Sequence, residues 1–232
     1  MSYIESRNAY CNCEKRIYSG VGKYNIPEIV PQEFDLKDFE ILGFNYVKGE
    51  KFPKDKIVHF YLDDYQFDRV WKDPNGYTDV LKPFKAVLAP DFSLYTDFPR
   101  AVQIYNHYRK HWLARYWQEH GIKVIPTICW SDEDSFEWCF DGEPKNAVIS
   151  ISVLGCNRDG QMKTDYWKGF NKAIEVLQPK TILLFKGSSP VKLPPLNAEV
   201  IEVVSGNIKG AEDYKNGISR YNKENGDERD GW

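Results

Sequence analysis

The segment that decides the fold is Lys85-Ala86-Val87-Leu88-Ala89-Pro90-Asp91-Phe92-Ser93, an apolar run that leads directly into a polar turn. Every residue from Ala86 to Ala89 is apolar, whereas a strand with one wet face alternates apolar and polar residues. An unbroken apolar run is typical of a strand in a parallel sheet that is covered on both faces. The polar residues after it predict a loop at the carboxyl end of that strand.

Similar apolar runs recur along the chain and alternate with helical patterns, which indicates a parallel sheet. Strands are predicted over residues 39–46, 56–62, 85–89, 122–129, 147–154, 181–185 and 200–204, and long helices over 99–120 and 164–177. Two long helices are too few for a regular eight-fold barrel. We therefore expect an α/β fold with a mostly parallel sheet, in the form of an incomplete or distorted (β/α) TIM-like barrel. The alternative is an open doubly wound sheet.

The predicted helix over residues 99–120 has a broad aromatic stripe that should pack on the sheet. Its members recur at steps of three and four and are Val102, Tyr105, Tyr108, Trp112, Leu113, Tyr116 and Trp117. His107 and His111 lie one turn apart but lack the glutamate of a zincin motif, so we expect them to be solvated. Before this helix, Pro74-Asn75-Gly76 predicts a turn that ends a short helical stretch around residues 65–71.

Composition points to an ordinary globular chain. Of its 232 residues, 42% are hydrophobic and 28% are charged, and no apolar run approaches the ~18–20 residues of a membrane span. With no apolar signal sequence at the N-terminus, we expect a cytoplasmic protein that does not bind membranes. We divide it into an irregular N-terminal arm (1–38), a single α/β domain (39–207), and a surface helix with a polar disordered tail (208–232). Residues 20–23 lack the spacing of a phosphate-binding loop.

The five cysteines include no C-x-x-C motif, so reduced thiols are expected in the absence of an export signal. Cys11 and Cys13 lack a second pair to complete a zinc site. Cys129 and Cys156 stand in apolar runs, where a free cysteine is typically a small buried side chain. No metal-ligand set is predicted from these residues.

The candidate site follows from geometry, because both architectures bind ligands beyond the carboxyl ends of parallel strands. Crowded carboxylates repel, which raises the pKa of at least one of them and supplies an acid and a base for glycosyl or phosphoester hydrolysis. They could instead hold Mg²⁺. The predicted catalytic residues are Asp64, Asp91 and Asp132, and the predicted ligand-binding residues are Trp130, Tyr95, Ser93, Arg109 and Asn157.

Several of these residues also have a purely structural interpretation. Asp132 could cap the helix that follows it, and Asp91 could be a turn residue after Pro90. Trp130 could cover the core instead of stacking on a sugar or a nucleobase.

Four stretches of the chain occur in the same order in a known family. They are Val87 to Ser93 with Tyr95, the helix from Pro99 through Arg109 to Trp117, Val124 to Trp130, and Asn146 to Cys156. Over roughly residues 20–205 the chain resembles the domain of unknown function numbered 4417, found mostly in bacteria, phages and mobile elements. The resemblance implies a phage or mobile-element setting. It brings no established activity, so no site residue follows from it.

Three functions remain open at this stage. The preferred one is an enzyme that hydrolyses a nucleotide, a nucleoside or a sugar-phosphate ligand. The second is a non-catalytic phage or mobile-element protein that binds and sequesters a nucleotide or a host factor. The third is a nucleic-acid-binding accessory protein that uses the basic face formed by Arg109, Lys110 and Arg115, although the net charge of −3 argues against binding through the whole surface.

Overall fold

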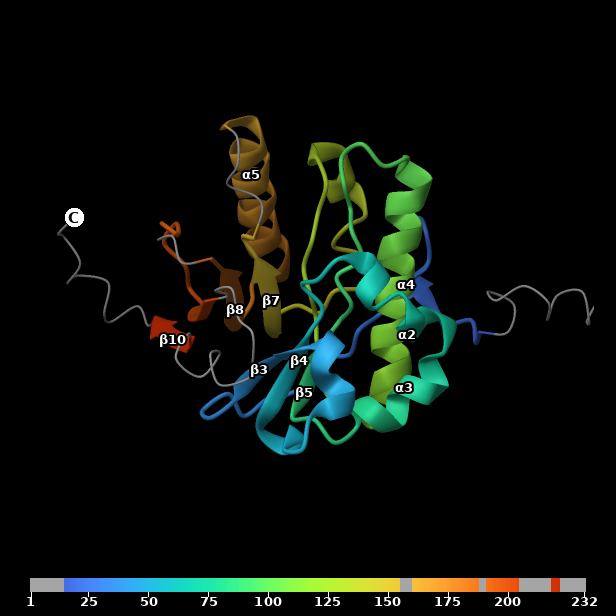
Figure 1. Ribbon diagram of the computed structural model, residues 1–232. Coiled ribbons are helices and arrows are strands. Elements are labelled where there is room, and N and C mark those ends of the chain that lie inside the picture. The colour runs from blue at the N-terminus through green and yellow to red at the C-terminus, as the bar shows by residue number, and fades with distance from the viewer. Residues whose placement is uncertain (1–14, 155–159, 188–190, 205–217, 222–232) are drawn as a thin grey trace, which may run out of the picture.

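The computed structural model describes residues 15–154, 160–187, 191–204 and 218–221, which form two four-stranded sheets (Figure 1). The first sheet has the order β3-β4-β5-β6 and the second β10-β9-β8-β7. Their strands are β3 (Glu40–Gly43), β4 (Lys56–His59), β5 (Ala86–Leu88), β6 (Val124–Ile125), β7 (Val148–Ser152), β8 (Thr181–Lys186), β9 (Glu199–Val204) and β10 (Ile218–Tyr221). All neighbours pair in parallel except β9 and β10, so the prediction of a mostly parallel α/β fold is confirmed.

The two sheets meet between β6 and β7, where Thr127 and Ser150 form a parallel bridge. Pro126 has no backbone N–H to donate, and β6 is accordingly shorter than the strand predicted over residues 122–129. Side chains of the two sheets also touch, since the ring of Phe185 in β8 lies 4.6 Å from that of Tyr61, just after β4. Among the described residues the edge strands β3 and β10 are not paired with each other, so no closed barrel forms.

Two long helices flank these sheets. α4 (Arg100–Glu119) packs Trp112, Leu113 and Trp117 into the larger core, and α5 (Gly160–Leu177) stands beside β7 and β8 (Figure 1). The shorter elements are β1 (Gly20–Val21), β2 (Ile26–Pro27), η1 (Phe44–Gly49), η2 (Pro53–Asp55), η3 (Asp64–Gln66), α2 (Arg69–Lys72), α3 (Pro74–Leu81) and η4 (Glu133–Glu137). None of the helices among the described residues has the length and apolar content needed to cross a bilayer.

The prediction of a turn at residues 74–76 is wrong, because α3 begins at Pro74. Pro74 occupies the first helical position, where its missing N–H costs nothing. The Asp73 side chain accepts a hydrogen bond from the backbone N–H of Gly76 at 2.9 Å and caps the helix.

The prediction that His107 and His111 are solvated is also wrong, since they are 1% and 0% exposed. Their face of α4 is covered by segments remote in sequence: His111 Nδ1 lies 2.9 Å from the carbonyl oxygen of Pro27 in β2, and His107 Nε2 lies 3.1 Å from that of Asp141. The predicted stripe is correspondingly incomplete, because Val102 is 41% exposed. A polar face of α4 is therefore buried as well as an aromatic one.

The arm is anchored to the domain. Residues 20–27 form the hairpin β1–β2, with Gly22 at a φ of 69°, and not a phosphate-binding loop. Ile26 is fully buried, and the backbone N–H of Ile29 donates to the carbonyl of Gly142. Beyond residue 208, where a surface helix and a disordered tail are expected, residues 218–221 form β10. Cys11, Cys13, Cys156 and Asn157 lie outside the described residues.

Candidate functional site

The carboxyl ends of β4 and β5 meet at Asp64 and Ser93, as the strand-end rule predicts. Asp64 begins η3 after β4, and Ser93 follows β5. Ser93 Oγ donates to Asp64 Oδ1 at 2.8 Å, and its backbone N–H lies 3.2 Å from both carboxylate oxygens. Two loops far apart in sequence are thus joined through one carboxylate.

Arg109 of α4 reaches the same place. Its guanidinium lies 3.7 Å from Asp64, 2.8 Å from Asp68 and 3.6 Å above the centre of the Phe92 ring. Its Nε also donates to the side chain of Asn106 at 3.1 Å. Burial would raise the pKa of Asp68, but Lys72 and Arg109 lower it below its usual value. Arg109 is therefore in the predicted position, but its donors already face acceptors within the protein.

Asp91 follows β5 and is partly buried in a polar cluster. Burial raises its pKa to about 7, and the charge of Asp64 acts in the same direction. Lys110 and a hydrogen bond with Cys129 act in the opposite direction and are outweighed. Burial also raises the pKa of the Cys129 thiol to about 12 and that of Tyr61 well above its usual value. Asp91 can therefore gain or lose a proton near neutral pH.

Sequence reasoning missed Lys110, Cys129 and Tyr61 as members of this cluster. Lys110 is 1% exposed, and its ammonium donates to the carbonyl of Thr127 at 2.8 Å and to Glu143 at 2.6 Å. The Cys129 sulfur lies 3.9 Å from the same nitrogen. Cys129 ends the strand predicted over residues 122–129, and Tyr61 is the last residue but one of the strand predicted over 56–62, so the strand-end rule already contained the signal for them. The sequence contained no such signal for Lys110, because a lysine on the polar face of a helix is ordinarily exposed to solvent.

Asp132 stands apart from this cluster. It caps η4 by accepting from the backbone N–H of Ser135 at 3.0 Å, and both of its oxygens accept from Arg100 at 2.9 and 3.0 Å. Burial would raise the pKa of Asp132, but Arg100 lowers it below its usual value. Arg100 lies nine residues before Arg109 on α4, which corresponds to about 13 Å of helix. The three predicted aspartates therefore do not converge on one point.

The predicted aromatic residues are placed differently from one another. Tyr95 is 58% exposed, with its ring 5.1 Å from that of Phe98. Trp130 is partly buried against α5, where its ring lies 5.2 Å from that of Tyr166 and its indole contacts Gly169. Trp130 therefore covers part of the core, which is the structural interpretation given for it above.

Gly169→Ala tests how firmly Trp130 is packed. An alanine inside a helix ordinarily stabilises it by up to about 1 kcal/mol relative to glycine, but a Cβ here would overlap the Trp130 indole. We expect Gly169→Ala to destabilise the protein by about 1–3 kcal/mol in urea unfolding. Gly160→Ala, where a Cβ meets open space at the start of α5, is the matched control. A gain in stability for Gly169→Ala would instead show that Trp130 moves freely.

The carboxylates predicted to hold Mg²⁺ do not form a three-ligand group among the described residues. In that part of the chain the His, Cys, Asp and Glu side chains that gather closely enough are His107, His111 and Glu143. All three are buried. Among the described residues, the potential metal ligands that lie close together are therefore on the buried polar face of α4 and the segment after η4.

Comparison with known proteins identifies the family. The model of the domain of unknown function DUF4417 matches residues 18–202. The chain is 35% identical to the Gene 1 protein of Mycobacterium phage L5 over 162 residues, which covers 70% of this chain and 71% of that protein. It is 39% identical to the Gene 1 protein of Mycobacterium phage D29 over 164 residues, covering 70% of this chain and 60% of that protein. No solved structure matches. The chain therefore belongs to the DUF4417 family, and it is similar to these two phage proteins.

Proposed function

We propose that the protein is a hydrolase that acts on a nucleotide, a nucleoside or a related sugar-phosphate ligand, with Asp91 as its general acid or base. One observation carries the proposal: at the carboxyl ends of β4 and β5, burial and the charge of Asp64 raise the pKa of Asp91 to about 7. A carboxyl group with such a pKa exchanges protons efficiently at neutral pH. Perturbed groups of this kind concentrate at functional sites.

The two aspartates have different roles in this proposal. Asp64 accepts from Ser93 Oγ at 2.8 Å and lies 3.7 Å from Arg109, and its role is to stabilise positive charge that develops on the ligand. Asp91 takes a proton from water as the water oxygen bonds to the reacting carbon or phosphorus. It then returns the proton to the leaving group as the scissile bond breaks. Asp132 has no part in this chemistry, because it caps η4 and pairs with Arg100.

Exposed aromatic rings beside these residues support a planar or sugar-bearing ligand. Tyr65 follows Asp64 and is 79% exposed, and Tyr95 lies two residues after Ser93 and is 58% exposed. Such rings can stack on a nucleobase or a sugar. In this proposal the two joined sheets act as an incomplete barrel with the ligand at its carboxyl-end rim, and Arg109 contacts phosphate after exchanging one of its carboxylate partners.

Asp91→Asn tests the proposal. The variant keeps the shape of the side chain but cannot transfer a proton. Purified protein is incubated with a panel of nucleosides, nucleotides and sugar phosphates, and products are followed by mass spectrometry. We expect turnover by the wild type and a loss of about 10²–10⁴-fold in Asp91→Asn. Asp97→Asn, at an exposed position of the same loop, is the control and should retain activity. Equal turnover by wild type and Asp91→Asn would contradict the role of Asp91.

A non-catalytic binder is the second candidate, and the exposed rings of Tyr65 and Tyr95 favour it, because they can stack on a ligand without any proton transfer. It predicts stoichiometric binding of a panel member that is recovered unchanged. Mass spectrometry of the bound fraction distinguishes this outcome from hydrolysis.

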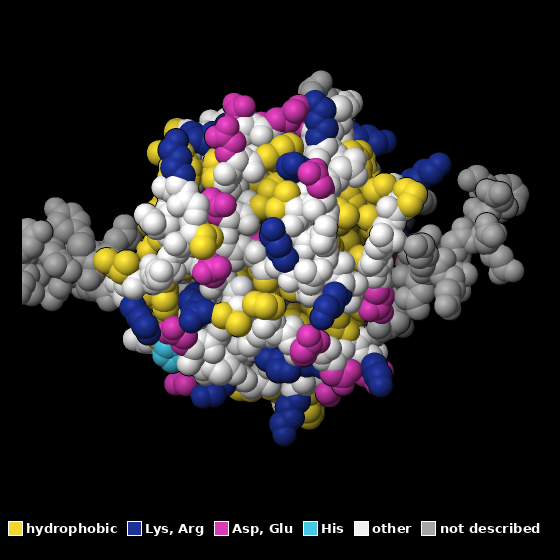
Figure 2. All heavy atoms as spheres, turned by 180° about the vertical axis from the view of Figure 1, so that it is seen from behind, with side chains coloured by type: hydrophobic (Ala, Val, Ile, Leu, Met, Phe, Trp, Pro, Cys, Tyr) yellow, Lys and Arg dark blue, Asp and Glu magenta, His cyan; other side chains and the backbone are white. Residues whose placement is uncertain are grey.

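The nucleic-acid hypothesis receives less support. It needs a basic face on α4, but the cations of this helix pair with acidic side chains. The pairs are Arg100–Asp132, Arg109–Asp68, Lys110–Glu143 and Arg115–Glu119. On the molecular face opposite to the view of Figure 1, side chains of both charges are interspersed (Figure 2). Nucleic-acid binding relies instead on clustered Lys and Arg.

A further inference from the structure

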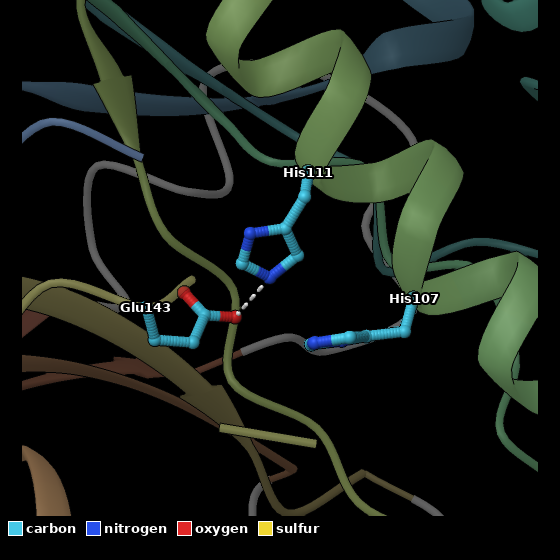
Figure 3. A group of neighbouring side chains, drawn as sticks. All are labelled: His107, His111 and Glu143. Carbon is cyan, nitrogen blue, oxygen red and sulfur yellow. Dashed lines mark hydrogen bonds and ion pairs between the residues drawn. The ribbon is translucent and has the colours of Figure 1, made fainter. Parts of the chain in front are cut away.

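A second polar site lies on the buried face of α4. His107 and His111 are one helical turn apart, with ring centres separated by 4.3 Å, and both point toward Glu143 from the segment after η4 (Figure 3). One ligand atom from each of the three residues lies within 4.8 Å of the others. Their side chains are almost completely enclosed, at 1%, 0% and 8% residue exposure.

His107 presents an unused lone pair. Its Nε2 lies 3.1 Å from the carbonyl oxygen of Asp141, and a carbonyl can only accept, so Nε2 carries the proton. In a neutral imidazole the other nitrogen is then an acceptor. That atom, Nδ1, is buried and has no hydrogen-bond partner in the described part of the chain. Burial lowers the pKa of His107 well below its usual value. The ring is therefore neutral at pH 7, and Nδ1 keeps its lone pair instead of taking a second proton.

His111 faces two acceptors with one proton. Its Nδ1 lies 2.9 Å from the carbonyl oxygen of Pro27, and its Nε2 lies 3.0 Å from Glu143 Oε1. Burial lowers the pKa of His111, which favours the neutral ring with a single N–H. If Nδ1 donates to Pro27, a lone pair of Nε2 faces the carboxylate. A cation between them would turn this repulsion into attraction.

Glu143 also has an unused oxygen. Its Oε1 accepts from Lys110 at 2.6 Å, whereas Oε2 is buried and has no hydrogen-bond partner among the residues that the structure describes. Burial would raise the pKa of Glu143, but Lys110 and His111 lower it, so the side chain is a carboxylate. The group thus combines three ligand atoms close enough to meet one ion with two buried polar atoms, His107 Nδ1 and Glu143 Oε2, that lack a partner among the described residues.

We propose that His107, His111 and Glu143 bind one divalent transition-metal ion, Zn²⁺ being the best match. Two imidazoles and one carboxylate are a zinc ligand set that leaves a fourth position open. In zinc sites the second nitrogen of each histidine donates to a carbonyl or carboxylate, which fixes the ring. The carbonyls of Asp141 and Pro27 occupy those positions here.

Gly142 makes this arrangement sterically feasible. It has a φ of 76°, and a Cβ at this position would lie 2.5 Å from the Pro27 oxygen and 2.8 Å from His111 Nδ1. The bound ion would join α4, the segment after η4 and the hairpin β1–β2. The proposal is independent of the hydrolase proposal, because neither Asp64 nor Asp91 is a ligand.

Metal binding by the wild type is the primary test. The protein is unfolded with a chelator and refolded with Co²⁺ or Zn²⁺, because the enclosed site should load during folding. We expect one equivalent of tightly bound metal, and a Co²⁺ visible spectrum that lacks thiolate charge-transfer absorption. Proton NMR of the Co²⁺ form should show two strongly shifted imidazole N–H signals, one for each carbonyl-bonded ring. Failure to bind stoichiometric metal, or a Co²⁺ form without shifted imidazole signals, would overturn the proposal.

Variants locate the ligands. His107→Gln and Glu143→Gln should each lose stoichiometric metal binding, with folding checked by circular dichroism. His120→Gln, at an exposed position at the end of the same helix, is the matched control and should bind metal normally. A Cys11→Ser/Cys13→Ser double variant should also bind normally. Loss of binding in the cysteine variant, or its retention in both ligand variants, would contradict the assignment.

Discussion

Lys110→Met is expected to destabilise the metal-free protein by about 3–5 kcal/mol, because it leaves the Glu143 carboxylate buried without its cation. The side chains of Lys110 and Glu143 are 1% and 0% exposed, and they form the 2.6 Å ion pair at the centre of the polar cluster. Methionine fills a similar volume, so the effect reports the lost charge and not a cavity. Urea unfolding at pH 7 in a chelator measures it.

Two variants make this prediction specific. Lys110→Met/Glu143→Gln should recover part of the loss, because no unpaired charge remains buried. Lys72→Met removes an ion pair with Asp68 at 2.8 Å, but the Lys72 side chain is 75% exposed, so the expected change is below about 1 kcal/mol. A Lys110→Met effect as small as that of Lys72→Met would show that Glu143 finds another partner or a proton.

Asp91→Asn is expected to become increasingly more stable than the wild type as the pH rises from 4 to 7. The pKa of Asp91 is about 7 in the folded state, against an ordinary value of 3.8 for an aspartate in the unfolded chain. Between these values the folded state holds a proton that the unfolded state has released, so the wild type loses stability as the pH rises. Asparagine resembles the protonated acid at every pH. The difference should reach at most about 4 kcal/mol above pH 7.

The stability of Asp91→Asn must be compared with that of the wild type at each pH, because buried histidines make the stability of both proteins rise with pH, opposite to the effect of Asp91. Burial lowers the pKa of His59 to about 4, so its contribution to stability is present above pH 6.5 and is lost as the pH falls. The wild type and Asp91→Asn share this His59 contribution, so subtracting one unfolding free energy from the other removes it. Thermal or urea unfolding at half-unit steps from pH 4 to 8 provides the profiles, with Asp97→Asn as the control that should follow the wild type. A constant difference between Asp91→Asn and the wild type would rule out a proton held by Asp91.

Some of the site could be predicted because the relevant information is local. The apolar run that ends at Ala89 identifies a buried strand, and parallel strands bring their carboxyl ends to one edge. That rule alone placed Asp64 beside Ser93. The strand-end rule could not show that Asp132 lies apart from Asp64 and Ser93. A residue that follows a strand can lie at the edge of the sheet or can cap the next helix. Here Asp132 does the latter by capping η4.

Other features depend on contacts that periodicity does not encode. The same sequence at residues 74–76 could end one helix or begin another, and the capping contact from Asp73 decides for α3. Trp130 could have been a stacking surface, but Gly169 allows α5 to approach its indole.

The sequence by itself determined that this is an α/β chain with mostly parallel strands, because strand and helix patterns arise from the spacing of neighbouring residues. Only the tertiary structure decided that His107, Lys110 and His111 are enclosed. Whether a polar helix face meets water depends on what covers it, and here the covering segments are the hairpin β1–β2 and residues 141–143. Enclosure removes solvent from these groups, and the loss of solvent gives the cluster its unused lone pairs and its shifted pKa values.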